Sequence, residues 1–410
     1  MNDRTRVPAG FLFRTAGSIA FGRGARDRIA DAAKGLGLRA LLVTGARSFA
    51  TSGELDRTSA RLASAGLAVT TWSVAGEPDV DVVDRGASVA RAFDADVVVA
   101  VGGGSVLDAA KAIAAVAPNG GEAVDYLEDL PGRAPAKPIR VAPLPLVAAP
   151  TTAGTGSEVT RNAVLRVPQA ALKRSMRDDR MLPAVAVVDP DLAATAPRPI
   201  AVAAALDALT HLIESYVSTG AQPTTDLLAL EGARRAVHAL RVLAEDAGGA
   251  SGGDPWDDLA LASLWGGIAL ANAGLGAAHG LAAPLGGRCT VPHGAACAAL
   301  LGPTVRGNVE AMTARTPDAP ALARYRVLAR ALSGTDDPLR LADDLDALAR
   351  RLDAKPLSAY GATAADVSAI VGGARGGSMK YNPVTLTDAE LEAILRAAIG
   401  EVARGERGHP

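Results

Sequence analysis

Cysteine, histidine and aromatic residues are scarce in this chain of 410 residues, and each shortage narrows the class of protein. Cys289 and Cys297 are the only cysteines, too few for the disulfide framework of a small secreted protein. We interpret both as small buried hydrophobic side chains. Aromatic residues make up only 3% of the sequence, so the cores must consist mainly of alanine, valine and leucine.

No charge of one sign predominates, and long uninterrupted apolar runs are missing. The net charge of −2 argues against a nucleic-acid-binding surface. The N-terminal residues lead into no apolar signal core. Stretches such as Ala92–Val101 are too short to span a bilayer and are broken by Asp94 and Asp96. We therefore expect a soluble, cytoplasmic protein that binds neither nucleic acid nor membrane.

The two halves of the chain differ in their hydrophobic patterns. Short apolar runs, with helical patterns between several of them, occur at Ala40–Thr44, Leu67–Val74, Val97–Val101, Leu146–Ala149 and Ala184–Asp189. These runs predict a mostly parallel sheet covered on both faces. From about Pro199 only helical patterns follow, at Ala201–Ser218, Thr224–Leu243, Asp257–Asn272, Gly294–Leu301, Ala321–Leu332, Pro338–Leu352 and Asp388–Arg404. We predict an α/β domain over residues 1–198 and an all-helical domain over residues 199–410.

A glycine-rich turn joins the Val97–Val101 strand to a helical pattern. It reads Gly102-Gly103-Gly104-Ser105, and such a turn lets the backbone and the free N–H groups of a helix N-terminus approach a phosphate. Ser105 and Asp108 also have the spacing of a capping box. The alternative is a tight turn without a ligand, but the strand–glycine–helix context favours phosphate. Because position 107 is leucine, this is not the Gly-x-Gly-x-x-Gly fingerprint.

A second polar loop, residues 150–158, follows the apolar run that ends at Ala149. It contains Thr151, Thr152 and Thr155 together with two glycines. Loops just beyond the carboxyl ends of strands are where open α/β sheets bind ligands. A polar loop that only caps the next helix would have the same composition, so both interpretations stay open at this point.

Three of the five histidines lie where one metal ion could use them. Asp207 and His211 are four residues apart in a helical pattern, so they share one helical face. His279 and His293 each lie beside a glycine in a nearly uncharged segment. One carboxylate and three imidazoles suit Fe²⁺, Zn²⁺, Co²⁺ or Ni²⁺. Buried imidazoles satisfied by hydrogen bonds are the alternative for the last two.

These motifs, in this order, resemble those of the iron-containing (group III) alcohol dehydrogenase family over nearly the whole chain. The resemblance implies the dehydroquinate synthase-like architecture, with an N-terminal nucleotide-binding α/β domain, a C-terminal helical metal-binding domain, a cleft between them, and a homodimer. It implies a metal-dependent exchange of hydride between NAD(P)H and an aldehyde or ketone, with the metal polarising the substrate oxygen.

The resemblance also implies the roles of particular residues. Fe²⁺, or in some members Zn²⁺, would be held by Asp207, His211, His279 and His293. Lys173 resembles a family lysine near the active site, where an anionic substrate would suit it. Arg174 and Arg177 beside it are more simply interpreted as a solvated basic strand balanced by Asp178 and Asp179. The cofactor would be bound by Gly45, Gly102, Gly103, Gly104, Ser105, Asp108, Thr151, Thr152 and Thr155.

Two departures from the family pattern bear on chemistry. Many members have a second histidine four residues after the one matching His279, whereas this chain has Ala283, so proton delivery must use another group. Many NAD-preferring members have an aspartate for the adenosine ribose where this chain has Gly45, followed at a distance of two by Arg47. Without that carboxylate a 2′-phosphate is less repelled, so we expect NADPH to be tolerated.

Three other functions remain open from the sequence. A maleylacetate-reductase-like enzyme would reduce an anionic keto acid, although that subfamily often departs from the metal quartet. A metal lyase resembling 3-dehydroquinate synthase would use NAD only transiently, and the threonine-rich loop points away from it. A non-catalytic nucleotide-binding module would not need the four metal ligands.

Overall fold

The computed structural model describes residues 10–46, 53–170, 172–245 and 254–400, which form two compact units. The α/β unit comprises residues 15–204 and 256–271. The helical unit comprises the described parts of residues 1–14, 205–255 and 272–410. Residues 256–271, in the second half of the sequence, thus belong by their contacts to the α/β unit.

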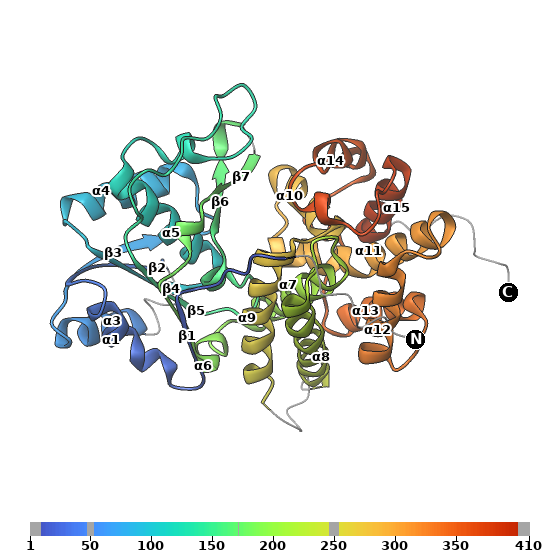
Figure 1. Ribbon diagram of the computed structural model, residues 1–410, viewed down its shortest axis with the longest axis horizontal. Coiled ribbons are helices and arrows are strands. Elements are labelled where there is room, and N and C mark those ends of the chain that lie inside the picture. Colours follow the sequence, from blue (N-terminus) through green and yellow to red (C-terminus); the bar gives the residue numbers. More distant parts are fainter. Residues whose placement is uncertain (1–9, 47–52, 171, 246–253, 401–410) are drawn as a thin grey trace. The chain divides into compact units, whose positions relative to one another are not determined.

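A six-stranded parallel sheet is the centre of the α/β unit (Figure 1). Its strand order is β1-β8-β5-β4-β2-β3. The strands are β1 (Ser18–Phe21), β2 (Arg39–Gly45), β3 (Ala68–Val74), β4 (Val97–Gly102), β5 (Leu146–Pro150) and β8 (Val185–Val188). The register places Val43 beside Ala100, and Val99 beside Val147. All five predicted strands are confirmed, whereas the short edge strand β1 was not predicted.

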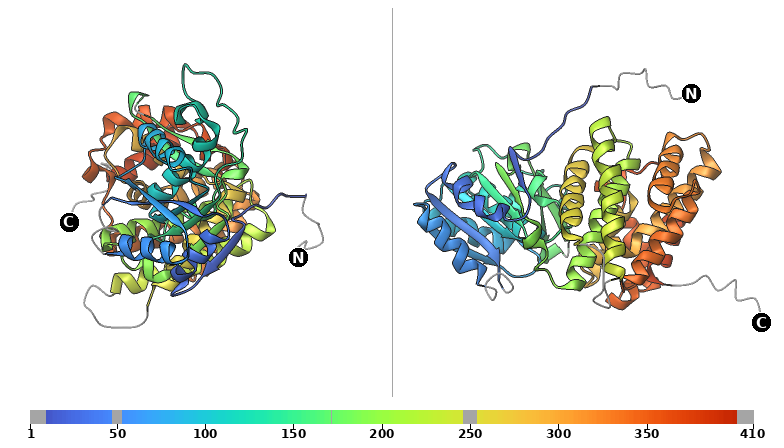
Figure 2. Two further views of the ribbon diagram at one scale, coloured as in Figure 1. Left: turned by 90° about the vertical axis from the view of Figure 1, so that its left-hand side faces the viewer. Right: turned by 90° about the horizontal axis from the view of Figure 1, so that it is seen from below.

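Helices cover both faces of this sheet (Figure 2). Alternate residues of β2 and β4 point to opposite faces, so Leu41 and Val98 enter one buried cluster and Leu42 and Val99 the other. The helices of the α/β unit that precede β5 are α1 (Ile29–Lys34), α3 (Glu54–Ser64), α4 (Val80–Ala92) and α5 (Gly104–Asn119). The covered faces explain why the strands are continuous apolar runs rather than alternating ones.

A separate antiparallel hairpin, β6 (Asn162–Val167) with β7 (Leu172–Arg177), lies beside α5. Asn162 pairs with Arg177 and Val167 with Leu172 in its register. Residues on β6 alternate between buried and exposed, as expected for a strand with one covered face. The basic strand was foreseen from the sequence, but its partner β6 was not.

Only helices follow β8 in the part of the chain that the structure describes. They are α6 (Pro190–Ala193), α7 (Arg198–Val217), α8 (Pro223–Glu245), α9 (Trp256–Ala273), α10 (Ala277–Arg288), α11 (His293–Arg315), α12 (Pro320–Ser333), α13 (Pro338–Arg351), α14 (Val367–Gly373) and α15 (Asp388–Ile399). The predicted helical patterns are confirmed within the described residues, and α11 continues past Pro303 well beyond its predicted end. Helix α15 ends at Ile399, before the predicted end at Arg404, and residues 401–404 lie outside the described residues. Helices α6, α10 and α14 were not predicted.

One described helix, α7, is long and apolar enough to cross a membrane, with a mean hydropathy of 1.4 over its most apolar window. In the structure 83% of that window is buried. Its apolar character is therefore that of a core helix.

The turn at Gly156 packs directly on α9 within the α/β unit. Gly156 has a φ of +60°, and a Cβ added to it would lie 2.3 Å from the Cα of Gly267. The backbone of the polar loop and the helix can approach this closely only because both positions are glycine. Gly334, after α12, has a similar φ of +70° but no atom near its Cβ position.

We expect Gly156→Ala to destabilise the protein by roughly 1–3 kcal/mol more than Gly334→Ala, because both place alanine at a positive φ but only the first also overpacks. Urea denaturation followed by circular dichroism measures the difference. Equal losses of stability in the two variants would show that the close contact between Gly156 and α9 does not limit the size of the side chain at position 156.

Candidate metal centre and nucleotide site

The four predicted metal ligands converge within the helical unit. Oδ1 of Asp207 lies 3.3 Å from Nε2 of His279, 3.7 Å from Nε2 of His293 and 3.7 Å from Nε2 of His211. The ring of His211 stacks on that of His279 with centroids 4.6 Å apart. The structure thus brings the four predicted residues together.

Three helices hold these side chains. Asp207 and His211 occupy one face of α7, His279 lies in the first turn of α10, and His293 begins α11. Asp207, His211 and His279 are only 2%, 4% and 6% exposed, whereas the side chain of His293 is 43% exposed. The cluster is thus closed on the α7 side and accessible beside His293.

Glu214, which was not predicted as a site residue, orients His279. Its Oε2 lies 2.6 Å from Nδ1 of His279, and its Oε1 accepts a hydrogen bond of 2.7 Å from the N–H of Ala278. A carboxylate on one ring nitrogen directs the other nitrogen towards a metal and makes it a better donor. The signal was present, because Asp207, His211 and Glu214 follow the i, i+4, i+7 spacing of a single helical face.

The electrostatics of the cluster fit a bound cation. Burial alone would raise the pKa of Asp207, but the charges of His211, His293 and His279 outweigh burial and hold that pKa well below its usual range. Burial would lower the pKa of His279, but Cys297, Asp207 and Glu214 together raise it well above its usual value. The buried carboxylate thus requires nearby positive charge, which a divalent metal among neutral imidazoles would supply.

Cys297 also contributes to this cluster. Its Sγ lies 3.5 Å from Nε2 of His279 and 3.8 Å from Nε2 of His293. The interpretation as a buried hydrophobic side chain is right about burial, since Cys297 is 0% exposed, but it omits this polar contact. His293 and Cys297 have the same i, i+4 spacing on α11 that Asp207 and His211 have on α7, and this spacing could have identified the cysteine.

The glycine turn of the α/β unit is built for close backbone approach. A Cβ on Gly102 would lie 2.5 Å from Val106, and one on Gly104 would lie 2.6 Å from Thr155. Thr151 donates its N–H to the carbonyl of Gly102 at 3.0 Å. The glycine turn is therefore adjacent to the polar loop of residues 150–158, here called the threonine loop. Gly103 precedes the first residue of α5 and has no side-chain cap, which leaves N–H groups at this helix end for an anion.

The predicted capping box of Ser105 and Asp108 is wrong. Helix α5 begins at Gly104, so Ser105 is already inside it. Asp108 instead accepts hydrogen bonds from Oγ of Ser157 at 2.5 Å and from the N–H of Val164 at 2.9 Å. Its observed contacts fasten the threonine loop and strand β6 to α5.

Gly45 lies beside this turn because of the sheet topology. The chain goes from β2 to β3 on one side and then returns to β4 on the other, so the strand order reverses between β2 and β4. Thr44 pairs with Val101, which places Gly45 at the carboxyl edge next to Gly102. Ligands of open α/β sheets bind at such a reversal. Arg47, predicted to approach a 2′-phosphate, lies outside the described residues.

The buried side chain of Lys111 forms hydrogen bonds to the end of the threonine loop. Nζ of Lys111, fully buried, donates to the carbonyl of Ser157 and to Oγ1 of Thr160, both at 2.9 Å. Burial lowers the pKa of Lys111, while Asp108 and Glu158 oppose that effect. Glu158 is 1% exposed, and among the described residues neither of its carboxylate oxygens has a hydrogen-bond partner. Burial raises the pKa of Glu158 to about 7.

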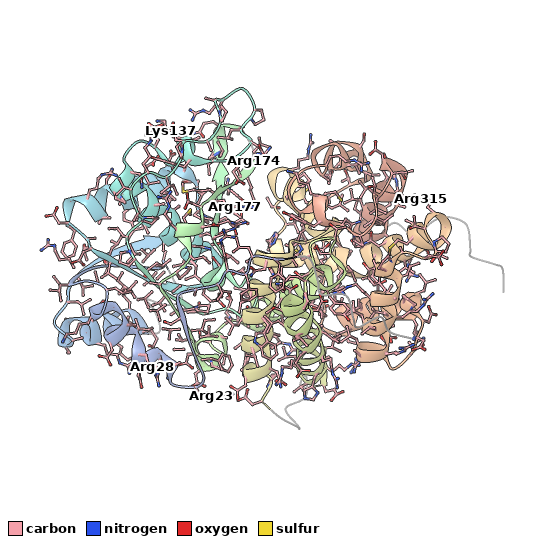
Figure 3. The ribbon with its side chains drawn as sticks, viewed as in Figure 1. Arg23, Arg28, Lys137, Arg174, Arg177 and Arg315 are labelled. Atoms are coloured by element: carbon pink, nitrogen blue, oxygen red, sulfur yellow. The ribbon has the colours of Figure 1, made fainter. Side chains whose placement is uncertain are left out.

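The basic side chains of β7 have partners within their own unit. Nζ of Lys173 lies 2.7 Å from Oε1 of Glu77, and Arg174 donates to the carbonyl of Asp129 at 3.0 Å. Arg177 lies 3.8 Å from Glu128, and Figure 3 shows both arginines on the hairpin. The expected balance by Asp178 and Asp179 is wrong, because these two carboxylates pair with Arg180 and Arg161 respectively.

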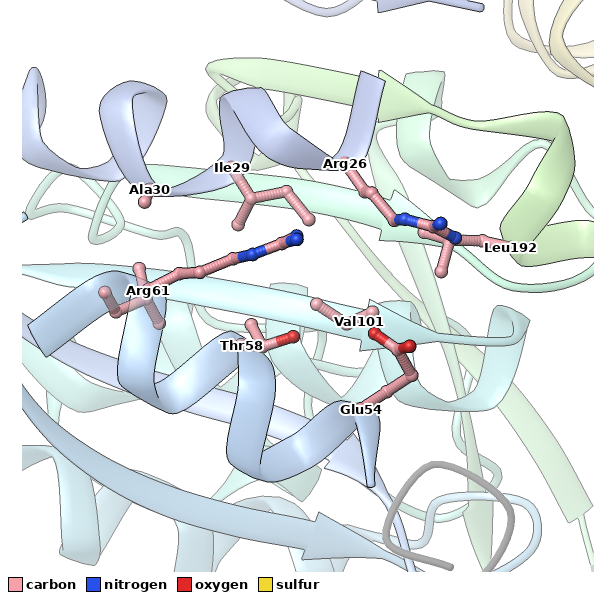
Figure 4. A pocket seen from close by; sticks show the side chains of 9 residues that line it. Arg26, Ile29, Ala30, Glu54, Thr58, Arg61, Val101 and Leu192 are labelled. Atoms are coloured by element: carbon pink, nitrogen blue, oxygen red, sulfur yellow. The ribbon is translucent and has the colours of Figure 1, made fainter. Parts of the chain in front are cut away.

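The small cavity between α1, α3 and the sheet offers no ligand site (Figure 4). Its volume is about 10 Å³, and Arg26, Ile29, Thr58 and Val101 are among the side chains that line it. A cavity of this size holds at most one water molecule.

A carboxylate–imidazole cluster and a glycine turn at the reversal of a parallel sheet are features expected of a metal-dependent oxidoreductase. The sequence model of iron-containing alcohol dehydrogenase matches residues 16–190, and that of the C-terminal part of the Fe-containing alcohol dehydrogenase family matches residues 201–399. The chain belongs to the iron-containing alcohol dehydrogenase family, which confirms the resemblance, and it is an enzyme that interconverts an alcohol with an aldehyde or ketone.

Individual relatives agree with this assignment. Lactaldehyde reductase of Escherichia coli strain K12 is 35% identical over 292 residues, which are 71% of this chain and 74% of that protein. The crystal structure of the archaeal alcohol dehydrogenase ADH/D1 from a Red Sea brine pool has a TM-score of 0.86 and 29% identity, covering 96% of this chain and 100% of that one. Sulfoacetaldehyde reductase of Bifidobacterium kashiwanohense, solved in complex with NAD⁺, has a TM-score of 0.83 and 29% identity over 96% of this chain and 100% of that one.

The raised pKa of Glu158 predicts a pH-dependent stability. The folded chain binds this proton more tightly than the unfolded chain, whose carboxyl titrates near 4.5. The stabilising effect of the bound proton is complete below that value and is lost as the pH rises to about 7. Glu158→Gln should therefore gain stability relative to the parent protein between pH 5 and pH 8, by up to about 3 kcal/mol.

Urea denaturation at the two pH values measures this gain, with the exposed Glu310→Gln as the matched control. A difference between Glu158→Gln and the parent protein that does not change with pH would show that Glu158 is ionised throughout.

Proposed function

We propose that the protein is a cytoplasmic, homodimeric alcohol dehydrogenase or aldehyde reductase that uses NAD(P)(H) and one Fe²⁺ or Zn²⁺ ion. Residues 1–198 would bind the nucleotide and residues 199–410 the metal. The observation that supports this proposal best is the convergence of His211, His279 and His293 on the buried carboxylate of Asp207. All four ligands are retained, which favours this function over a maleylacetate-reductase-like one.

The donor set fits a divalent metal. Imidazoles and one carboxylate suit Fe²⁺ and Zn²⁺, and the carboxylate behind His279 is the outer partner that such histidines usually have. When bound, the metal would act as a Lewis acid on the substrate oxygen. Asp207, His211 and His279 would fix its position, while the exposed side of the cluster at His293 would admit the substrate.

The α/β unit would bind the dinucleotide through its backbone. Gly102, Gly103 and Gly104 allow a pyrophosphate to approach the N-terminus of α5, and Thr151 and Thr152 lie on the adjacent loop. Gly45 leaves space and no negative charge at the neighbouring strand end, so both NADH and NADPH would be accepted. The nicotinamide supplies the hydride chemistry when bound.

Lys173 would interact with an anionic group of the substrate near the active site. Its ion pair with Glu77 leaves the side chain 14% exposed, so the substrate would have to compete with that carboxylate. The proposal therefore includes neutral and anionic aldehydes as substrates. Ala283 is exposed on α10 and cannot carry a proton, so we propose that proton transfer uses water or a cofactor hydroxyl.

Replacement of one ligand tests the metal centre. We expect His279→Ala to reduce the metal content of protein purified without oxygen to near zero and to abolish turnover, because the imidazole that contacts Asp207, Glu214 and Cys297 is removed. His238→Ala, on the exposed side of α8, is the matched control and should retain both. Elemental analysis and NAD(P)H oxidation with an aldehyde panel measure the outcome, and full activity of His279→Ala without metal would refute the proposed centre.

A carboxylate at position 45 tests the nucleotide site. Gly45→Asp should shift the ratio of kcat/KM for NADPH over NADH towards NADH by about tenfold or more, since one charge–charge contact of 1.4 kcal/mol corresponds to that factor. The position tolerates a side chain, because an added Cβ would come no closer than 3.9 Å to Val106. Gly45→Ala is the control for bulk alone. An unchanged ratio in Gly45→Asp would place the adenosine ribose elsewhere.

A further inference from the structure

The thiol of Cys297 lies among the ligand atoms of the metal centre rather than merely near it. Four atoms lie within 4.8 Å of one another: a carboxylate oxygen of Asp207, one imidazole nitrogen each of His279 and His293, and Sγ of Cys297. His211 is not a member of this set of four, although its Nε2 is 3.7 Å from Oδ1 of Asp207. The thiol is therefore a better-placed donor than one of the predicted ligands.

Four of the six separations within this set match a tetrahedron around a metal ion, and the other two are within 4.8 Å. Metal–nitrogen bonds of about 2.05 Å and metal–sulfur bonds of about 2.3 Å give nitrogen–nitrogen edges of about 3.4 Å and nitrogen–sulfur edges of about 3.6 Å. The edges from Asp207 Oδ1 to His279 and His293 are 3.3 and 3.7 Å, and those from Cys297 Sγ to the same nitrogens are 3.5 and 3.8 Å. These four edges differ from the tetrahedral values by only a few tenths of an ångström.

Apart from these two histidines, the described residues around the sulfur of Cys297 are mostly apolar. Cys297 is fully buried in the apolar cluster between α10, α11 and α15, with Leu281 and Leu300 among its members. Among the described residues, its polar contacts are with the two imidazole nitrogens of His279 and His293. A sulfur that only filled apolar space would have no reason to face Nε2 of two histidines at once.

We propose that in the protein without substrate Cys297 takes the place of His211 and binds the metal as a thiolate. With Asp207, His279 and His293 it forms a four-coordinate site that favours Zn²⁺ or Co²⁺ over harder cations. The inference rests on the metal centre of the proposed function. The thiol proton passes to solvent when the metal binds. Thiolate is a soft donor, so it raises the affinity for Zn²⁺ relative to Mn²⁺ or Mg²⁺, which prefer oxygen.

Cobalt substitution of the full chain tests the thiolate bond directly. Apoprotein loaded with Co²⁺ without oxygen should show visible d–d bands of tetrahedral intensity together with a near-ultraviolet sulfur-to-cobalt charge-transfer band. Cys297→Ser should lose the charge-transfer band and keep the d–d bands. Cys289→Ser is the matched control, because Cys289 lies outside the cluster, and it should keep both features.

The outcomes separate this inference from the proposed function. Bound cobalt with d–d bands but no charge-transfer band in the parent protein would overturn the thiolate ligand and leave the metal centre standing. Failure to bind cobalt at all would overturn both. If Cys297→Ser does not fold, the parent spectrum alone decides between these outcomes.

Metal competition provides a second measurement that is independent of activity. With a chromophoric chelator, Cys297→Ser should bind Zn²⁺ more weakly by more than about tenfold, since even loss of an outer partner costs that much. The affinity for Mn²⁺ should change much less. Equal loss of affinity for the two metals, or no loss, would show that the sulfur only packs against the histidines.

Discussion

The interaction on which the metal centre depends is the one between Glu214 and the N-terminus of α10. One carboxylate oxygen engages Nδ1 of His279 at 2.6 Å, and the other accepts the N–H of Ala278 at 2.7 Å. A single side chain of α7 thus satisfies a free N–H of α10 and fixes the ring that faces Asp207. Gly276 is required next to it, because an added Cβ would lie 2.9 Å from the same carboxylate. The position of α10 and the orientation of its histidine therefore have one common cause.

A buried polar network extends this anchor. Oδ1 of Asn382 accepts the N–H of Ala277 at 3.0 Å, and its amide nitrogen donates to Oδ1 of Asn308 at 2.8 Å. Asn308 in turn donates to the hydroxyl of Tyr325 at 3.1 Å. Since buried polar groups are costly unless paired, such a network permits few alternative packings of α10, α11 and α12. The rigidity that a metal centre needs is supported here by these satisfied polar groups, since aromatic side chains make up only 3% of the sequence.

The local hydrophobic pattern of the sequence was sufficient to predict most helices and strands, but not those that depend on contacts with residues distant in sequence. The apolar runs of β2, β4 and β5 predicted the sheet because both of its faces are covered. Helix α10 was not predicted, since Pro284 and several glycines interrupt its pattern, and its start is secured by residues far away in sequence. The metal quartet was predicted because three of its members are among only five histidines in the chain. Glu214 and Cys297 were missed because carboxylates are common, a lone cysteine is usually apolar, and their meaning comes from partners 65 and 18 residues away.

The proposed nucleotide site and the proposed metal centre differ in how many specific side chains they require. The nucleotide site needs glycines, a helix N-terminus and the reversal of strand order between β2 and β4, so it is largely a property of the backbone. The metal centre needs particular atoms on three helices, and replacing one donor alters both the charge and the softness of the site. In the proposed sites the fold would therefore determine where a dinucleotide binds, whereas the residues of α7, α10 and α11 would determine which metal is held. A sulfur donor at Cys297 would make this chain's metal preference a property of one residue, without any change in the surrounding fold.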